Sequence, residues 1–197
     1  MIGMAVAIFT LVTSLVGSGG PRHPAEPMAP CHSRTSGYDN QGHWLVAYAD
    51  HTTHAALSTQ VTAAAHMINK ALRNVQLLEN TPADIVISET SSGPVGRTAL
   101  HCGASSGTAT ISLNERLLTP PAAVTPRTVL LVIAHEFGHA LGLAHTDEPC
   151  ALMHATNGDC PREDQIQFTP AEQAAIDNLY SPPPGPDVIS PAPWPRS

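Results

Sequence analysis

Three histidines and one glutamate fall within the thirteen residues from Ile133 to His145, although only 13% of the chain is charged. His135 and His139 are four residues apart, so on a helix both imidazoles face the same way and can reach one ion. Neutral imidazole nitrogens are good ligands for Zn²⁺. The spacing therefore predicts a helix that carries two zinc ligands.

Glu136 and His145 complete the predicted site. Glu136 lies one step round the helix, where it can stay outside the coordination shell and contact a zinc-bound water as a general base. His145 lies six residues beyond His139, too far round to share its helical face. Gly142 can take the left-handed conformation that ends a helix, so a turn there can bring His145 back to the metal. We therefore predict one catalytic Zn²⁺ with three histidine ligands and one open position.

A helix with solvent-exposed histidines is the simpler alternative. The preceding residues Val129–Ala134 are apolar on every side of the helix, which indicates that it is buried. Buried imidazoles without partners would be costly. The short motif His-Glu-x-x-His is expected about 0.02 times by chance in a chain of this composition, and the longer pattern far less often. The metal site is therefore the better interpretation.

The elements around this motif indicate an α/β domain with a mixed sheet. Apolar residues recur three and four apart from Ala56 to Leu77, which predicts an amphipathic helix. Strands are predicted from compact apolar or alternating runs at His43–Asp50, Ala83–Thr90, Gly96–Cys102 and Gly107–Leu113.

Two further helices follow the predicted strands. Thr125 and Pro126 suit the N-cap and first position of a helix that should run to about Leu141. Thr169 and Glu172 have capping-box spacing at the start of a terminal helix. The predicted order is strand, helix, three strands, helix, loop and helix.

The two ends of the chain differ from this domain in composition. An uncharged apolar run from Ile2 to Val16 is short for a membrane span and is followed by small residues, as in a secretory signal. The run lacks a preceding Lys or Arg, so an uncleaved anchor or a misplaced start are alternatives. The predicted organisation is a signal peptide, a short pro-segment or flexible arm, one domain and a Pro-rich tail, at residues 1–20, 21–37, 38–181 and 182–197.

The charge and the cysteines indicate a secreted protein that does not bind polyanions. The net charge is −7 and no run of Lys or Arg exists, so neither nucleic acid nor, after signal removal, a membrane is an expected partner. Four cysteines form an even set, for which disulfides are the default in an exported chain. Cys150 and Cys160 are ten residues apart across a loop and are paired, which leaves Cys31 with Cys102.

The segment HEFGHALGLAHTDEPCALM, which ends at Met153, resembles the metzincin zinc endopeptidases and in particular their matrixin branch. The closing AIDNLY is similar to the end of a matrixin catalytic domain. The resemblance is dense from Val129 to Tyr180 and general from Tyr38 to Leu118. It implies a five-stranded, mostly parallel mixed sheet over an active-site helix, with a cleft across the zinc. It also implies that Ala151–Met153 form a Met-turn, an apolar floor under the imidazoles.

Two features depart from the matrixin pattern. Matrixins usually carry a cysteine whose thiolate occupies the zinc, but the residues around Cys31 do not match that segment, and we favour the disulfide over a switch. The region from Ser91 to Gly107 is too short and too poor in Asp for the second zinc and the calcium ions of larger matrixins. A minimal domain with a single metal is therefore expected. His154 is interpreted as a loop residue, with a place in the specificity pocket as the alternative.

The expected reaction is hydrolysis of an internal peptide bond, with a protein or peptide as the substrate. The enzyme is expected to be a monomer. Zinc would polarise the carbonyl and lower the pKa of its water from ~15.7 toward ~7, and Glu136 would accept and then return the proton. A non-cleaving module that binds zinc and peptide, a zinc hydrolase of another substrate, and a structural module whose Pro-rich tail recruits another domain are the alternatives. An extended substrate would add a strand to the edge formed by Arg97, Thr98, Ala99, Leu100 and His101.

Overall fold

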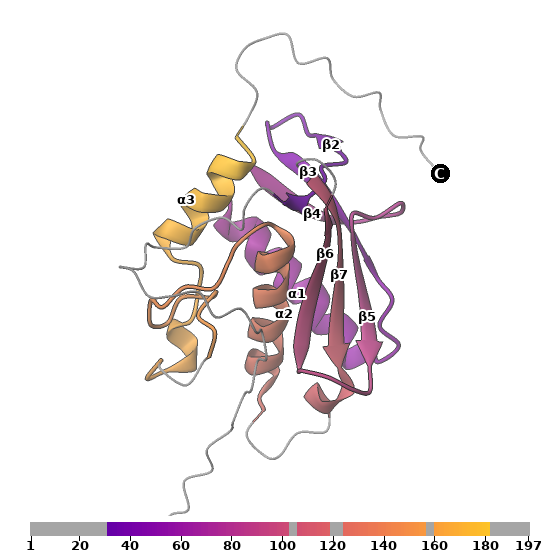
Figure 1. Ribbon diagram of the computed structural model, residues 1–197, viewed down its shortest axis with the longest axis vertical. Helices are drawn as coiled ribbons and strands as arrows, with labels where there is room; N and C mark the ends of the chain where they lie inside the picture. The colour runs from indigo at the N-terminus through magenta and orange to yellow at the C-terminus, as the bar shows by residue number, and fades with distance from the viewer. Residues whose placement is uncertain (1–30, 103–105, 119–123, 157–159, 182–197) are drawn as a thin grey trace, which may run out of the picture.

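The computed structural model describes residues 31–102, 106–118, 124–156 and 160–181 (Figure 1). The predicted signal peptide, most of the predicted arm and the Pro-rich tail lie outside these residues. Among the described residues, no helix combines the length and the apolar character needed to cross a membrane.

A mixed sheet forms one layer of the fold. Its five longer strands lie in the order β4-β3-β5-β7-β6, and all neighbours are parallel except β6, which runs antiparallel to β7. Two short strands, β1 and β2, pair with β7 and β3. This arrangement confirms the predicted fold class. The strands are β1 His32–Ser33, β2 Gly37–Tyr38, β3 Trp44–Asp50, β4 Val75–Glu79, β5 Ile85–Thr90, β6 Gly96–Cys102 and β7 Ser106–Asn114.

Two helices, α1 (Ala55–Ala71) and α2 (Pro126–Ala140), pack against each other on one side of the sheet (Figure 1). Both helices turn apolar faces to the sheet, and most of α2 is buried, as its apolar sequence predicts. A third helix, α3 (Pro170–Leu179), is seen in Figure 1 to the left of α2, whereas strands β5, β6 and β7 are seen to its right. Short 3₁₀ turns occur at Glu115–Leu117 and Glu163–Gln165.

The first helix is shorter than predicted. The expected helix over Ala56–Leu77 ends at Ala71, and Val75–Glu79 form the separate strand β4. The apolar residues that suggested a continuing helix, Val75 and Leu77, instead alternate into the core. Asn69 fixes the change of direction, because its side chain accepts from the Leu77 N–H at 2.7 Å and donates to the Leu77 carbonyl at 2.9 Å. Tertiary pairing with β3 therefore overrides the helical period.

Part of the segment predicted as a flexible arm belongs to the sheet. His32 and Ser33 pair with β7, and the Ser33 hydroxyl donates to the Ala140 carbonyl at the end of α2, at 2.8 Å. Tyr180 donates to the Ser33 carbonyl at 3.2 Å. These long-range contacts were not visible in the local sequence, which has no period there.

The helices begin in two different ways. Helices α2 and α3 start with capping boxes formed within their own first turns, Thr125 with Thr128 and Thr169 with Glu172. The N-cap of α1, His54, provides no side-chain cap. Instead the carboxylate of Glu89, on β5, accepts from the N–H groups of Thr53 and His54 at 2.8 and 2.9 Å.

Candidate metal centre

The chain reverses at the end of α2 through Gly142, which has a φ of +102°. This left-handed conformation suits glycine, and it is the helix stop that the sequence predicts. A side chain would also have little room, because a Cβ at Gly142 would lie 3.0 Å from both the Cβ of His32 and the Cδ1 of Leu179. The turn brings His145 to the two histidines of α2.

The three predicted ligands meet at their Nε2 atoms. The Nε2 of His145 lies 3.2 Å from that of His135 and 3.1 Å from that of His139. Among the described residues, this is the only group of three or more His, Cys, Asp or Glu side chains that converges closely enough to bind a metal ion.

The Nδ1 contacts of His135 and His139 show that the Nε2 atom of each ring is the one that carries the free lone pair. The Nδ1 of His135 lies 2.8 Å from the Leu152 carbonyl, and that of His139 lies 2.8 Å from the Leu143 carbonyl. A carbonyl oxygen only accepts, so both Nδ1 atoms carry the proton and leave Nε2 free to bind a metal. Ligands at ~2.0–2.1 Å around a tetrahedral ion are about 3.3 Å apart, close to the observed separations. The triad therefore fits zinc.

Burial keeps these imidazoles neutral, as metal binding requires. It lowers the pKa of His135 to about 3, with a further contribution from repulsion by His139. Burial also lowers the pKa of His139 to about 4 and lowers that of His145.

Glu136 is 2% exposed and lies between α2 and the edge strand β6. Its Oε2 accepts a hydrogen bond of 2.7 Å from the Thr98 hydroxyl. Burial raises the pKa of Glu136 to about 7, although the hydrogen bond from Thr98 opposes this shift. The carboxylate can thus hold or release a proton near neutral pH, as a general base must.

The Met-turn packs directly beneath α2. Met153 is fully buried, and a Cβ added at Gly138 would lie only 2.3 Å from its Sδ, so the close approach depends on that glycine. The Met153 N–H donates to Glu172 Oε1 at 2.7 Å. The sequence marked Glu172 only as a capping residue. The structure gives it a second role, because the other oxygen caps α3 through the Thr169 N–H.

The predicted substrate-binding residues lie on β6, which in the described part of the chain pairs with β7 alone and leaves its other edge open. Arg97 and His101 are exposed, whereas Ala99 and Leu100 are half-buried. Thr98 differs from its neighbours because its hydroxyl points to Glu136, which the sequence pattern did not reveal.

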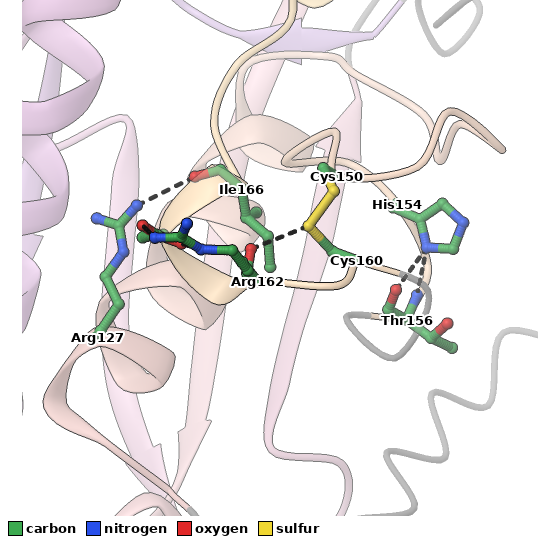
Figure 2. Close-up of a disulfide and its surroundings, with 8 residues drawn as sticks. Arg127, Cys150, His154, Thr156, Cys160, Arg162 and Ile166 are labelled. Atoms are coloured by element: carbon green, nitrogen blue, oxygen red, sulfur yellow. Dashed lines mark hydrogen bonds and ion pairs between the residues drawn. A yellow bond between two sulfur atoms is a disulfide. The ribbon is translucent and has the colours of Figure 1, made fainter.

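Two disulfides connect the segments around this centre, with the pairs expected from the sequence. Cys31 is bonded to Cys102 at the end of β6, and Cys150 is bonded to Cys160 in the loop after the third histidine. Figure 2 shows this second disulfide beside the loop that Arg127 of α2 holds through a 3.0 Å hydrogen bond to the Ile166 carbonyl. His154 extends from the same region, and its Nδ1 faces the backbone of Thr156 (Figure 2).

The comparisons with known proteins agree with this geometry. The matrixin family model matches residues 25–181. Matrix metalloproteinase-9 of Canis lupus familiaris is 43% identical over 63 residues, which are 30% of this chain and 8% of that protein. Matrix metalloproteinase-20 of Homo sapiens is 72% identical over 25 residues, or 13% of this chain and 5% of that protein. The matched part of the chain thus spans less than a tenth of either relative.

A solved structure shows the same fold. High choriolytic enzyme 1, a hatching enzyme zinc-protease from Oryzias latipes, aligns with a TM-score of 0.50 and 13% identity over 80% of this chain and 98% of that one. The family model covers most of the chain, including every element from β1 to α3. The chain therefore belongs to the matrixin family, as the resemblance of its zinc-binding motif predicted.

Proposed function

We propose that this protein is a secreted zinc-dependent endopeptidase that hydrolyses internal peptide bonds. The observation that carries the proposal is the convergence of three neutral imidazoles next to a buried carboxylate, with the Nδ1–H groups of His135 and His139 donating to backbone carbonyls. A site that only bound a metal would have no use for a carboxylate in this position. Membership of the matrixin family supports the same conclusion.

His135, His139 and His145 would hold one Zn²⁺. When bound, zinc supplies a Lewis acid that polarises a carbonyl and lowers the pKa of water from ~15.7 toward ~7. Glu136 accepts a proton from the attacking water and delivers it to the nitrogen of the departing amine. The C–N bond of the substrate breaks and one water is consumed. No serine or cysteine of the chain forms a covalent intermediate.

The open edge of β6 would bind the substrate. A peptide in extended conformation can pair with this edge through backbone hydrogen bonds, which align the scissile bond across the metal site without requiring a particular sequence. Arg97, Ala99, Leu100 and His101 would then lie beside the substrate, with Thr98 facing the helix. Both disulfides are consistent with an oxidising, extracellular environment.

The experiment compares cleavage of casein by the parent protein, by the protein treated with a zinc chelator, and by Glu136→Ala. We expect the parent to cleave and to contain about one zinc per chain, with three protein ligands and an open position. Chelation should abolish cleavage, and zinc should restore it. Glu136→Ala should keep its zinc yet lose about 10²–10⁴-fold in rate, the usual contribution of a general acid–base.

Two results would contradict the proposal. A Glu136→Ala protein that cleaves as fast as the parent would exclude the assigned general base. A properly oxidised parent that binds zinc but cleaves neither casein nor a peptide library would indicate a binding module or a hydrolase of another substrate.

A further inference from the structure

We infer that Thr98 is a positioning residue, which fixes the Glu136 carboxylate in its working orientation within a space that Gly96 leaves open. This inference rests on the proposed function, because it concerns the general base of that reaction. It assigns a role to the side chain of Thr98 that differs from the substrate contact predicted for this strand.

The hydrogen bond itself favours the carboxylate. The Thr98 hydroxyl lies 2.7 Å from Glu136 Oε2 and 3.0 Å from the Glu136 backbone carbonyl. A hydroxyl has a single proton to donate, and a charged carboxylate is a stronger acceptor than a carbonyl. Thr98 therefore donates chiefly to Oε2 when Glu136 is ionised.

The position of Thr98 makes it a rigid donor. It pairs with Ile111 across the β6–β7 ladder, and Ile111 is completely buried. Threonine is also branched at Cβ, which restricts its χ1 angle. The donor is thus held by the sheet, whereas Glu136 belongs to the helix, so the bond ties the general base to a second structural element.

Gly96 provides the space that this orientation needs. A Cβ at residue 96 would lie 2.6 Å from Glu136 Oε1, 2.9 Å from its Cγ and 2.9 Å from a methyl carbon of Val132. Any larger residue would have to push the carboxylate or the helix away. Gly96 and Thr98 are two residues apart on the strand, so they act on the same face of β6.

The two residues act in complementary ways. Gly96 permits the carboxylate to approach the strand, and Thr98 then fixes one of its oxygens. The glutamate side chain has three rotatable bonds, and without Thr98 its buried carboxylate would lose the hydrogen bond that fixes Oε2. The strand whose Thr98 fixes the carboxylate is also the proposed substrate-binding edge. The positions of Glu136 and of the bound substrate would therefore both be set by β6.

The test uses the zinc-loaded protein with four substitutions. Thr98→Val removes the hydroxyl and keeps the shape, whereas Thr98→Ser restores a donor. Gly96→Ala adds the methyl group that overlaps the carboxylate. Thr59→Val is the matched control, because it makes the same change at an exposed threonine of α1 whose hydroxyl donates to the Ala55 carbonyl, away from Glu136 and β6.

We expect Thr98→Val and Gly96→Ala to lower kcat roughly 10- to 100-fold with KM changed less than about 2-fold, since misplacement of a catalytic group by about 1 Å costs on the order of 10²-fold. Thr98→Ser should recover most of the lost kcat, and Thr59→Val should behave as the parent. Zinc content should stay at the parental level in all four. Crystal structures should show the Glu136 carboxylate displaced in Thr98→Val and Gly96→Ala.

The outcomes separate this inference from the proposed function. If the parent cleaves but Thr98→Val and Thr98→Ser have the parental kcat, Thr98 does not position the base. If Thr98→Val fails to fold, the kcat of Gly96→Ala becomes the test. A parental kcat for Gly96→Ala overturns the inference. If the parent itself does not cleave, the proposed function fails, and an undisplaced carboxylate in the Thr98→Val crystal structure then overturns the inference on its own.

Discussion

The half of the molecule that contains α2, the Met-turn and α3 uses contacts close in sequence at its helix starts and at the turn before His145, whereas the sheet half depends on contacts between distant residues. In the first half, His139 binds the carbonyl of Leu143 and Glu172 caps its own helix. In the second, Glu89 caps a helix that starts 34 residues earlier in the chain, and Ser33 of β1 joins the two halves by donating to the Ala140 carbonyl across 107 residues.

The metal ligands and Glu136 depend on these two halves to different extents. The three ligands lie within eleven residues, and Gly142 and the Leu143 carbonyl shape the turn that brings His145 to the other two. The proposed general base requires both halves, because Glu136 lies on α2 and its hydrogen-bond donor Thr98 lies on β6. Substitutions in the two halves should therefore have different consequences.

The largest contrast is expected between the two disulfides. The Cys31–Cys102 bond closes a loop of 71 residues and the Cys150–Cys160 bond one of 10. Since the entropy that a crosslink removes from the unfolded chain grows with loop length, replacing the first pair with Ser should cost about 4 kcal/mol and the second about 3 kcal/mol. Urea unfolding of the two zinc-loaded double variants measures both. A larger loss for Cys150–Cys160 would contradict the comparison.

A somewhat smaller effect is expected at Glu172. Glu172→Ala leaves the buried N–H groups of Met153 and Thr169 without their acceptor, at a cost of roughly 2–4 kcal/mol in unfolding free energy. Glu172→Gln keeps one acceptor oxygen and should lose less. Thermal unfolding compares these variants with Asn178→Ala, an exposed position on the same helix. Equal stability of Glu172→Ala and Asn178→Ala would exclude the double role of this carboxylate.

The smallest effect concerns the cap that α1 receives from β5. Partial burial raises the pKa of Glu89, but hydrogen bonds from His54 and Thr53 outweigh it and lower the pKa to about 2. A carboxyl group with a lowered pKa stabilises the fold above its ordinary value near 4.5, and this contribution is lost as the pH falls toward 2. Glu89→Gln should cost about 1 kcal/mol at pH 6.

The pH dependence of the stabilisation by Glu89 provides the test of this prediction. The difference in unfolding free energy between the parent and Glu89→Gln should shrink when measured at pH 6, then 4, then 3. A difference that stays constant over this range would show that the charge on Glu89 does not stabilise α1.

The three histidines that fit a zinc site, and the helix that carries two of them, could be predicted from the sequence for a simple physical reason. A helix places residues four apart on one face, a glycine ends it, and both rules act within thirteen residues. The start of α2 at Thr125 and of α3 at Thr169 followed from capping residues that act within one turn. The sheet strands β3, β5, β6 and β7 were likewise visible as apolar runs.

Other features depend on contacts between residues that are far apart in the chain. Val75 and Leu77 fitted a helical period, and the pairing of β4 with β3 made them a strand. Ser33, Thr98 and Gly138 carry no local signal, because each is defined by a partner that the chain reaches only after folding. The residues that can bind a metal were therefore predictable from the sequence, because helix periodicity and the glycine stop act locally. The fold decided what holds Glu136 beside them, since that contact joins a helix to a strand.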